Sequence, residues 1–310
     1  MDELIAQLRG EIVARAAGKC LLWVDPAQHD PYEDNAIVAQ RRVRVPISHV
    51  NFAMQRAPYL VPLDLAVPGD ADLFYDSVER AWQAWTIDSL RALLGQPVCG
   101  WVVTQSQAEA LAVHWGRHCH LHGHQYKSKL LRFQDPGVRE WLWPALNAAQ
   151  QHALLGPAAC VLALGRTHSL LRHEGASADA ALAAFGLDDQ QWQQAGDYAT
   201  VHAAWLDCAI VAGSACFDPV FNESMLLSVL AALDEATRHG VTQRSERKLH
   251  ARHALQLGSR FHTDARMRPV WELTCAGRYY GSAIEEIFSC AADELHLHWT
   301  STKEHTAWPT

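Results

Sequence analysis

The stretch that decides the fold is Lys129–Leu164, which reads KLLRFQDPGVREWLWPALNAAQQHALLGPAACVLAL. It opens with Lys129–Phe133, a short apolar run typical of a strand. Asp135 then stands directly before Pro136, and this pair predicts the start of a helix, because Asp caps free N–H groups and Pro has none to leave unpaired. A second apolar run, Cys160–Leu164, predicts the next strand.

Upstream of this stretch the same alternation of strand and helix patterns continues. Between the apolar runs, Asp72–Leu94 and Gln105–His118 carry apolar residues at helical spacing. Three further apolar runs predict strands: Cys20–Asp25, Tyr59–Leu65 and Val98–Thr104. Strands separated by helices are typical of a parallel sheet with crossover helices. We therefore predict an α/β N-terminal lobe built on a mostly parallel sheet.

Downstream, the strand patterns fade after about Gly175, and helical spacing dominates. Small residues and glycines gather over residues 173–187, as is typical of a boundary between domains. We predict an α/β lobe over residues 1–175 and an all-α lobe over residues 187–310.

Composition excludes several classes of protein. The chain has 310 residues, of which 49% are hydrophobic and 19% charged, so it is neither a disulfide-stapled mini-protein nor disordered. The net charge of -8 argues against a nucleic-acid-binding protein. The sequence has no apolar run long enough for a secretion signal or a membrane span, and its eight cysteines form no CxxC pair. We expect a cytoplasmic protein with reduced thiols and no membrane partner.

The two signs of charge are separated in the second half of the chain. Residues 173–237 hold ten acidic and no basic residues, whereas residues 238–268 hold eight basic and two acidic ones. Within the basic segment Arg244, Lys248 and Arg252 share one helical face. Two interpretations stay open: the acidic helices pack against the basic one and their charges partly cancel, or the contrast forms a bipolar docking surface.

The sequence lacks the common catalytic motifs, namely the phosphate-binding loop, the dinucleotide fingerprint, HExxH and the GxSxG elbow. The conspicuous candidate is a row of four histidines at alternate positions, His118, His120, His122 and His124. Imidazole nitrogens suit zinc, but a single row is a poor tetrahedral cage, so a hairpin with polar side chains is the simpler interpretation. We expect no metal and no cofactor.

Three carboxylates, Asp25, Asp64 and Asp135, end predicted parallel strands, at the edge where α/β sheets place ligands. They suggest an alternative function, a metal- or carboxylate-dependent hydrolase that uses these residues or the row His118–His124. Caps and turns are the simpler explanation, and Arg132 is expected to pair with Asp135 or with the start of its helix.

Several tryptophans do not fall on a clearly buried face. Trp141, Trp143 and Trp192 are candidates for exposed anchors, which protein interfaces often use. Together with Arg244, Lys248 and Arg252, they are our candidate partner-binding residues.

The stretch Leu130–Leu164 resembles the hallmark of the type VI secretion adaptors, or effector chaperones, a family formerly described as a domain of unknown function. In that family a strand ends in Arg-aromatic-x-Asp-Pro, a leucine-rich helix follows, and Gly-Pro precedes the next strand. The corresponding residues here are Arg132, Phe133, Asp135, Pro136, Gly156 and Pro157. The opening strand that ends at Asp25 is similar to the family's first strand, although Pro26 departs from its pattern.

The resemblance, which covers roughly residues 20–165, implies a non-enzymatic adaptor. Such a protein would bind a type VI toxin effector, often through its N-terminal or PAAR-associated segment, and promote its loading onto the VgrG spike. The hallmark residues, including Arg132 and Asp135, would then shape the lobe rather than touch the partner.

Overall fold

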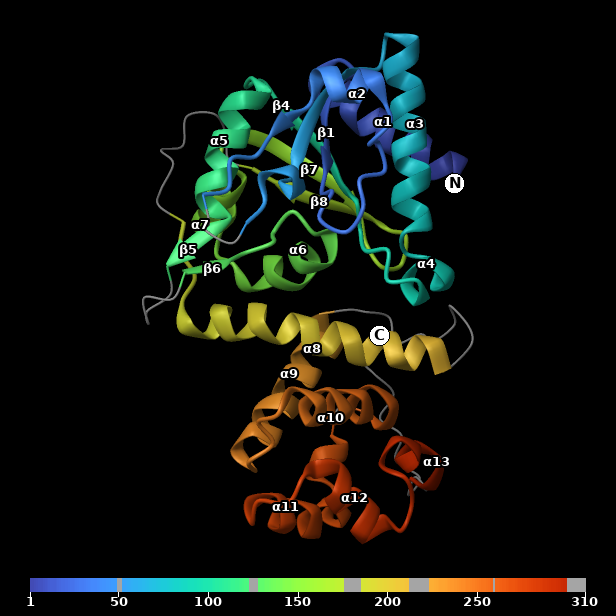
Figure 1. Ribbon diagram of the computed structural model, residues 1–310, viewed down its shortest axis with the longest axis vertical. Coiled ribbons are helices and arrows are strands. Elements are labelled where there is room, and N and C mark those ends of the chain that lie inside the picture. The colour runs from blue at the N-terminus through green and yellow to red at the C-terminus, as the bar shows by residue number, and fades with distance from the viewer. Residues whose placement is uncertain (49–51, 123–127, 176–184, 212–222, 259, 300–310) are drawn as a thin grey trace. The chain divides into compact units, whose positions relative to one another are not determined.

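The computed structural model describes residues 1–310 except 49–51, 123–127, 176–184, 212–222, 259 and 300–310 (Figure 1). The described strands are β1 (Lys19–Val24), β2 (Val43–Arg44), β3 (Tyr59–Asp64), β4 (Val98–Thr104), β5 (His120–His122), β6 (Ser128–Leu130), β7 (Ala158–Leu164) and β8 (Leu170–Glu174). The α-helices of the N-terminal half are α1 (Asp2–Ala16), α2 (Ala36–Arg41), α3 (Pro68–Gln83), α4 (Ile87–Arg91), α5 (Ala108–His118), α6 (Pro136–Leu142) and α7 (Ala148–Leu155). The later α-helices are α8 (Asp189–Val211), α9 (Glu223–Arg238), α10 (Arg244–Leu257), α11 (Arg268–Cys275), α12 (Tyr280–Phe288) and α13 (Leu295–His298).

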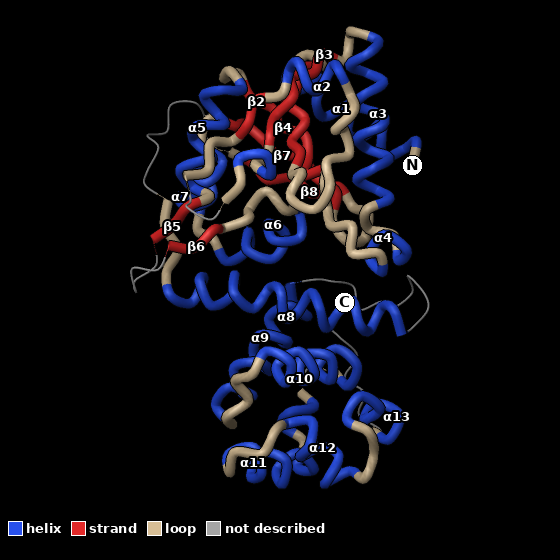
Figure 2. The backbone as a smooth tube through the Cα atoms, in the orientation of Figure 1, coloured by secondary structure: helices blue, strands red, loops and turns tan. Residues whose placement is uncertain are grey.

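Six strands form one sheet in the order β2-β3-β1-β4-β7-β8, and each neighbouring pair is antiparallel. Figure 2 draws the strands in red, among the helices of the N-terminal unit. The predicted parallel sheet is therefore wrong. Lys19 at the start of β1 lies opposite Asp64 at the end of β3, and Leu21 lies opposite Val102 of β4.

The connection between β3 and β4 shows why the prediction failed. It contains α3 and α4, and it joins two strands that run in the same direction, as a crossover helix should. These two strands are not neighbours, however, because β1 lies between them and runs the opposite way. The helical connection here joins parallel strands that are not neighbours, whereas the connection through α5, α6 and α7 joins β4 and β7, which are neighbours but antiparallel.

Helices cover both faces of the sheet, which explains why its central strands are apolar throughout. On one face the Trp23 ring stacks on Trp115 of α5 at 3.9 Å between centroids, and Phe133 packs against both. On the other face Trp101 packs against Phe74 of α3 and donates a hydrogen bond to the Ser77 hydroxyl at 2.9 Å.

Gly100 is required where β4 and β7 approach closely. Its φ is +141°, and a Cβ atom added there would lie 2.2 Å from the carbonyl oxygen of Leu162. Any other residue at this position would push the two strands apart.

The predicted strand Lys129–Phe133 is only partly present. Its start belongs to β6, which pairs with β5 in a separate two-stranded hairpin and not with the main sheet. The chain then leaves regular structure before α6, so that Phe133 packs in the core without a strand around it.

The chain divides into two compact units, Met1–Ala195 and Gly196–Thr310, and this division falls within α8. The described part of the second unit contains helices and no strand, in agreement with the predicted helical C-terminal half. The predicted boundary over residues 173–187 includes residues 176–184, which lie outside the described part of the chain. None of the helices in the described ranges is long and apolar enough to cross a lipid bilayer.

Candidate functional site: the polar corner at the end of the sheet

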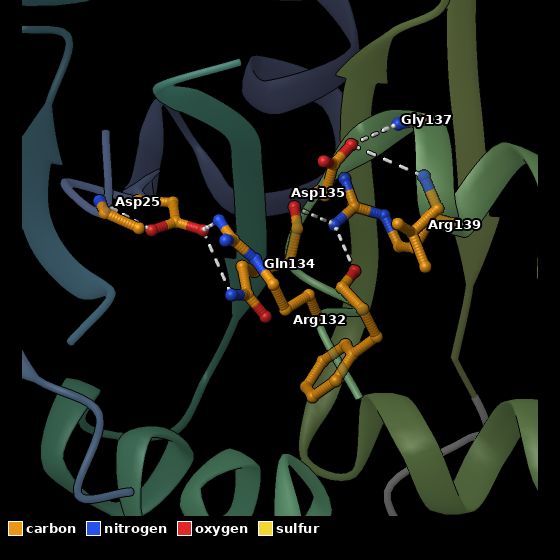
Figure 3. Close-up of polar contacts among 9 residues, drawn as sticks. Asp25, Arg132, Gln134, Asp135, Gly137 and Arg139 are labelled. Atoms are coloured by element: carbon orange, nitrogen blue, oxygen red, sulfur yellow. Dashed lines mark hydrogen bonds and ion pairs between the residues drawn. The ribbon is translucent and has the colours of Figure 1, made fainter. Parts of the chain in front are cut away.

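A group of charged side chains gathers at the edge of the sheet where β1 and β7 end and β4 begins, beside α6 (Figure 3). We call this group the polar corner. Its members are Asp25, Arg132, Gln134, Asp135, Arg139, Glu140 and Arg166.

Asp135 is the N-cap of α6, as the Asp-Pro pair predicts. Its Oδ1 accepts hydrogen bonds from the backbone N–H groups of Gly137 at 2.9 Å and Val138 at 3.4 Å. Pro136 occupies the first turn, where its missing N–H costs nothing. Burial raises the pKa of the Asp135 carboxyl, although the charges of Arg132 and Arg166 oppose that rise.

Asp25 is the partner of Arg132. Its Oδ2 accepts hydrogen bonds from Arg132 Nη2 at 2.6 Å and Gln134 Nε2 at 3.0 Å, while Oδ1 accepts from the backbone N–H of Ala27 at 3.0 Å. Arg132 was expected to pair with Asp135 or with the start of its helix, but its ion pair is with Asp25, just after β1. The Asp25 side chain is 4% exposed and that of Arg132 is 48% exposed, so only the Arg132 side of this pair reaches solvent.

Arg139 lies at the centre of the corner and was missed by the sequence analysis. It is 1% exposed, and its guanidinium donates to three backbone carbonyls, those of Phe133 at 3.0 Å, Gln134 at 2.8 Å and Cys99 at 2.6 Å. It also lies 5.1 Å from the Trp23 ring. Burial lowers the pKa of Arg139 to about 10. Nothing in the residues around it distinguishes this arginine from one on an exposed helix face.

A second ion pair completes the corner. Arg166, just after β7, lies with its Nε 3.4 Å from Glu140 Oε2, and the two side chains are 1% and 14% exposed. Burial raises the pKa of the Glu140 carboxyl, with Arg166 opposing. Arginines from two segments thus compensate carboxylates from β1 and α6, as buried charges require.

Both carboxylates have structural roles in this geometry. Asp25 accepts three hydrogen bonds, and Asp135 caps the start of α6. The third predicted carboxylate, Asp64, ends β3, which is antiparallel to β1, and therefore lies at the opposite edge of the sheet. The premise that these carboxylates share one edge is wrong because the sheet is not parallel.

The histidine row does not form one extended strand. His118 is the last residue of α5, and its Nδ1 lies 2.8 Å from the carbonyl oxygen of His114. His120 and His122 belong to β5, whereas His124 lies outside the described residues. The predicted hairpin is present as β5 and β6. Among the residues that the structure describes, no group of three His, Cys, Asp or Glu side chains is arranged to hold a metal ion.

The candidate anchors differ in exposure. Trp141 is completely buried, and its Nε1 donates to the Gln194 carbonyl at 2.8 Å, so its prediction as a surface anchor is wrong. Trp143 and Trp192 are half-buried against the core of the first unit. The sequence did not reveal this difference in burial, because Trp141 lies near the end of α6 and Trp143 follows that helix only two residues later.

The basic face of α10 is partly neutralised within the second unit. Lys248 Nζ lies 2.7 Å from Asp207 of α8, and the neighbouring Arg247 lies 2.6 Å from Asp197 of the same helix. The Arg252 guanidinium donates to the Asp293 carbonyl, whereas Arg244 is exposed at the start of α10. This supports the interpretation that acidic and basic helices pack together and partly cancel.

A groove of about 640 Å³ lies apart from the polar corner. It is formed by the segment around α2 together with α3, and its acidic lining comes from Asp30, Glu33, Asp34, Asp72 and Asp76. None of the strand-end carboxylates Asp25, Asp64 or Asp135 lines it.

Comparison with known protein families matches one segment of the chain. Residues 51–153 match a family described as a domain of unknown function, DUF4123. The match is about a third of the chain; it runs from just before β3 into α7 and includes Arg132, Asp135 and Arg139. No curated protein and no solved structure matches the chain.

Proposed function

We propose that this protein is an adaptor that binds a type VI secretion toxin effector and promotes its loading onto the VgrG spike. The proposal rests on two features that occur in the same segment of the chain. Residues 51–153 match DUF4123, and the Arg-aromatic-x-Asp-Pro hallmark at Arg132–Pro136, which resembles that of type VI adaptors, lies within them. The proposal includes no catalysis, no cofactor and no nucleic acid.

The role of the hallmark in the polar corner supports this proposal. Arg132 links the segment before α6 to the end of β1 through Asp25, and Asp135 starts α6. These residues hold the N-terminal unit together, so partner recognition would fall to other surfaces. We assign partner specificity to the helical unit, where Arg244 is exposed, and a supporting contact to the half-buried Trp143 and Trp192.

Co-expression with the toxin encoded beside the gene of this protein tests the proposal. A tag other than polyhistidine is needed, because the row His118–His124 would itself bind a nickel resin. We expect the toxin to co-elute with the tagged chain on size-exclusion chromatography, and VgrG to be loaded with toxin only when the chain is present. Equal loading of toxin onto VgrG without the chain would refute the proposal.

A charge reversal on α10 tests whether the exposed charge of this helix contributes to toxin binding. Arg244→Glu places a negative charge at an exposed position, and we expect it to weaken toxin binding about tenfold, the size typical of a reversed interfacial charge. Lys248→Gln is the matched control, since the Lys248 charge is already paired with Asp207 within the unit. Isothermal titration with purified toxin measures both; equal losses would show that the exposed charge has no special role.

The hydrolase alternative predicts a different result. A carboxylate-dependent enzyme would turn over a substrate without any partner, and a single substitution such as Asp25→Asn would abolish the activity without unfolding the chain. A turnover with these properties would overturn the adaptor proposal.

A further inference from the structure

An exposed cysteine in the helical unit has a histidine beside its sulfur and a carboxylate behind that histidine. Cys275 Sγ lies 3.7 Å from His239 Nδ1, and His239 Nε2 lies 3.0 Å from Glu235 Oε1. Cys275 is exposed at the end of α11, whereas Glu235 belongs to α9 and His239 follows that helix directly. The three groups stand in the order nucleophile, base and orienting acid.

Three features of the chain hold the imidazole in place. Glu235 and His239 are four residues apart, so they lie on one side of a helical turn. The imidazole stacks on Trp271 of α11 at 4.7 Å with an interplanar angle of 9°. Gly240 has a φ of +83°, and a Cβ atom there would lie 3.2 Å from the Thr274 carbonyl oxygen, so a glycine allows this turn to approach the end of α11 closely.

The hydrogen bond to Glu235 determines which nitrogen faces the sulfur. An ionised carboxylate only accepts hydrogen bonds, so His239 Nε2 carries the proton that it donates to Glu235. In the neutral imidazole Nδ1 then presents its lone pair to the Cys275 thiol. The C-terminal end of a helix does not favour a thiolate, because the backbone dipole is negative there. The imidazole is therefore the group that can draw the proton from this thiol.

We propose that Cys275 is an activated thiol that exchanges with low-molecular-weight disulfides, with His239 as its base and Glu235 as the positioning residue. The Cys275 proton moves to His239 Nδ1, and the sulfur attacks one sulfur of the disulfide. The S–S bond of the small molecule breaks, a new S–S bond forms to Cys275, and the leaving thiolate takes the proton from the imidazolium. Cys275 is oxidised and one equivalent of small thiol is released.

The first test measures alkylation, which reports on the thiolate alone. The full chain is treated with iodoacetamide at neutral pH, and the rate at each cysteine is read by peptide mass spectrometry. A free thiol is only a few per cent ionised at neutral pH. In the proposal His239 raises the ionised fraction of Cys275, so His239→Ala should return that fraction to the free-thiol level. We expect alkylation of Cys275 to slow roughly tenfold. Cys290, which is partly exposed, is the internal control and should keep its rate.

The second test uses glutathione disulfide as the probe. With Glu235 and His239 intact, Cys275 should form the mixed disulfide faster than Cys290, and His239→Ala should remove that advantage. Cys216, which lies outside the described residues, is replaced by Ser in every sample to keep the assignment clear.

Glu235→Gln separates base chemistry from damage to the fold. It keeps the shape of the side chain, and we expect a several-fold slower alkylation of Cys275 with an unchanged circular dichroism spectrum. If the His239→Ala protein does not fold, the alkylation rate of Cys275 in the Glu235→Gln protein provides the test. A Cys275 rate that stays the same in each folded variant would overturn the proposal.

Discussion

The two units of this protein bury ionisable side chains in opposite ways. In the N-terminal unit the polar corner compensates its carboxylates with arginines, and burial raises the pKa of Asp135 and Glu140. In the helical unit α10 buries two imidazoles, His250 and His253, among aromatic rings, and burial lowers their pKa. Desolvation therefore favours protonation of these carboxyls and opposes protonation of these imidazoles.

The two histidines of α10 are themselves unlike. His253 Nδ1 lies 2.8 Å from the Tyr280 hydroxyl and its Nε2 lies 2.8 Å from the Ala292 carbonyl oxygen. Both ring nitrogens of His250 are buried without a hydrogen-bond partner, and Phe261 and Trp271 pack around the ring. His250 thus fills an aromatic site while it contributes no hydrogen bond.

Acidification is expected to give the largest difference in stability between the two units. Burial lowers the pKa of His253 to about 3, whereas an unfolded histidine titrates near 6.5. The unfolded state therefore binds protons first, and the stability present above pH 6.5 is lost as the pH falls toward the folded value. For His253 the loss is about 1.4 kcal/mol per pH unit between the unfolded and folded pKa values, and His250 adds to it in the same direction.

Burial of a carboxyl changes the pH dependence of stability in the opposite direction. A carboxyl whose folded pKa is raised gains stability as the pH falls through that pKa and loses it as the pH rises, which applies to Asp135 and Glu140. His173, whose pKa burial lowers to about 3, opposes them in the N-terminal unit, and burial also lowers the pKa of His114, His118 and His168. We expect hydrogen exchange on acidification to rise in α10, α11 and α12 before it rises in β1, β4 and β7. Simultaneous exchange in both units would contradict this order.

A pair of variants tests the histidine interpretation. We expect His250→Leu to keep stability at neutral pH and to shift the acid transition to lower pH, because the ring donates to no partner. His253→Leu should instead destabilise by about 2 kcal/mol, since it leaves the Tyr280 hydroxyl and the Ala292 carbonyl unpaired. Acid unfolding followed by circular dichroism measures both.

Arg139 is expected to give the largest effect of a single substitution in the N-terminal unit. Arg139→Met keeps much of the volume but removes the donors from the carbonyls of Phe133, Gln134 and Cys99. We expect a loss of about 4 kcal/mol in urea unfolding, because buried acceptors without partners are costly. Arg132→Met is the matched control, since its side chain is half-exposed. Equal losses for both arginines would show that burial does not decide the cost.

Substitution of Asp25 is expected to give the next largest loss of stability in the N-terminal unit. Asp25→Ala removes the acceptor shared by Arg132 and Gln134, and we expect it to cost about 2 kcal/mol. A double-mutant cycle with Arg132→Ala should show a coupling of about 1 kcal/mol, because the Arg132 side chain is half-exposed. A coupling near zero would mean that the ion pair does not join β1 to the segment before α6.

The sequence was sufficient for local features and insufficient for long-range ones. The cap at Asp135 depends only on the residues beside it, and it was predicted correctly. The parallel sheet was wrong because strand adjacency depends on β1 lying between β3 and β4, which no local pattern records. The same limit explains the site: Arg132 and Asp25 are 107 residues apart, and the burial of Arg139 comes from β1 and β4.

The smallest expected effect concerns the hallmark carboxylate itself. Asp135→Ala removes the cap of α6 and should cost about 1 kcal/mol in urea unfolding. Asp135→Asn is the matched control: an amide oxygen caps as well, and because burial already raises the pKa of this carboxyl, losing its charge should cost little. If the proposed function holds, toxin loading should weaken only in proportion to the unfolded fraction, because the contacts of Asp135 are with the start of α6. An Asp135→Ala protein with full stability and no toxin binding would move the hallmark from the scaffold to the interface.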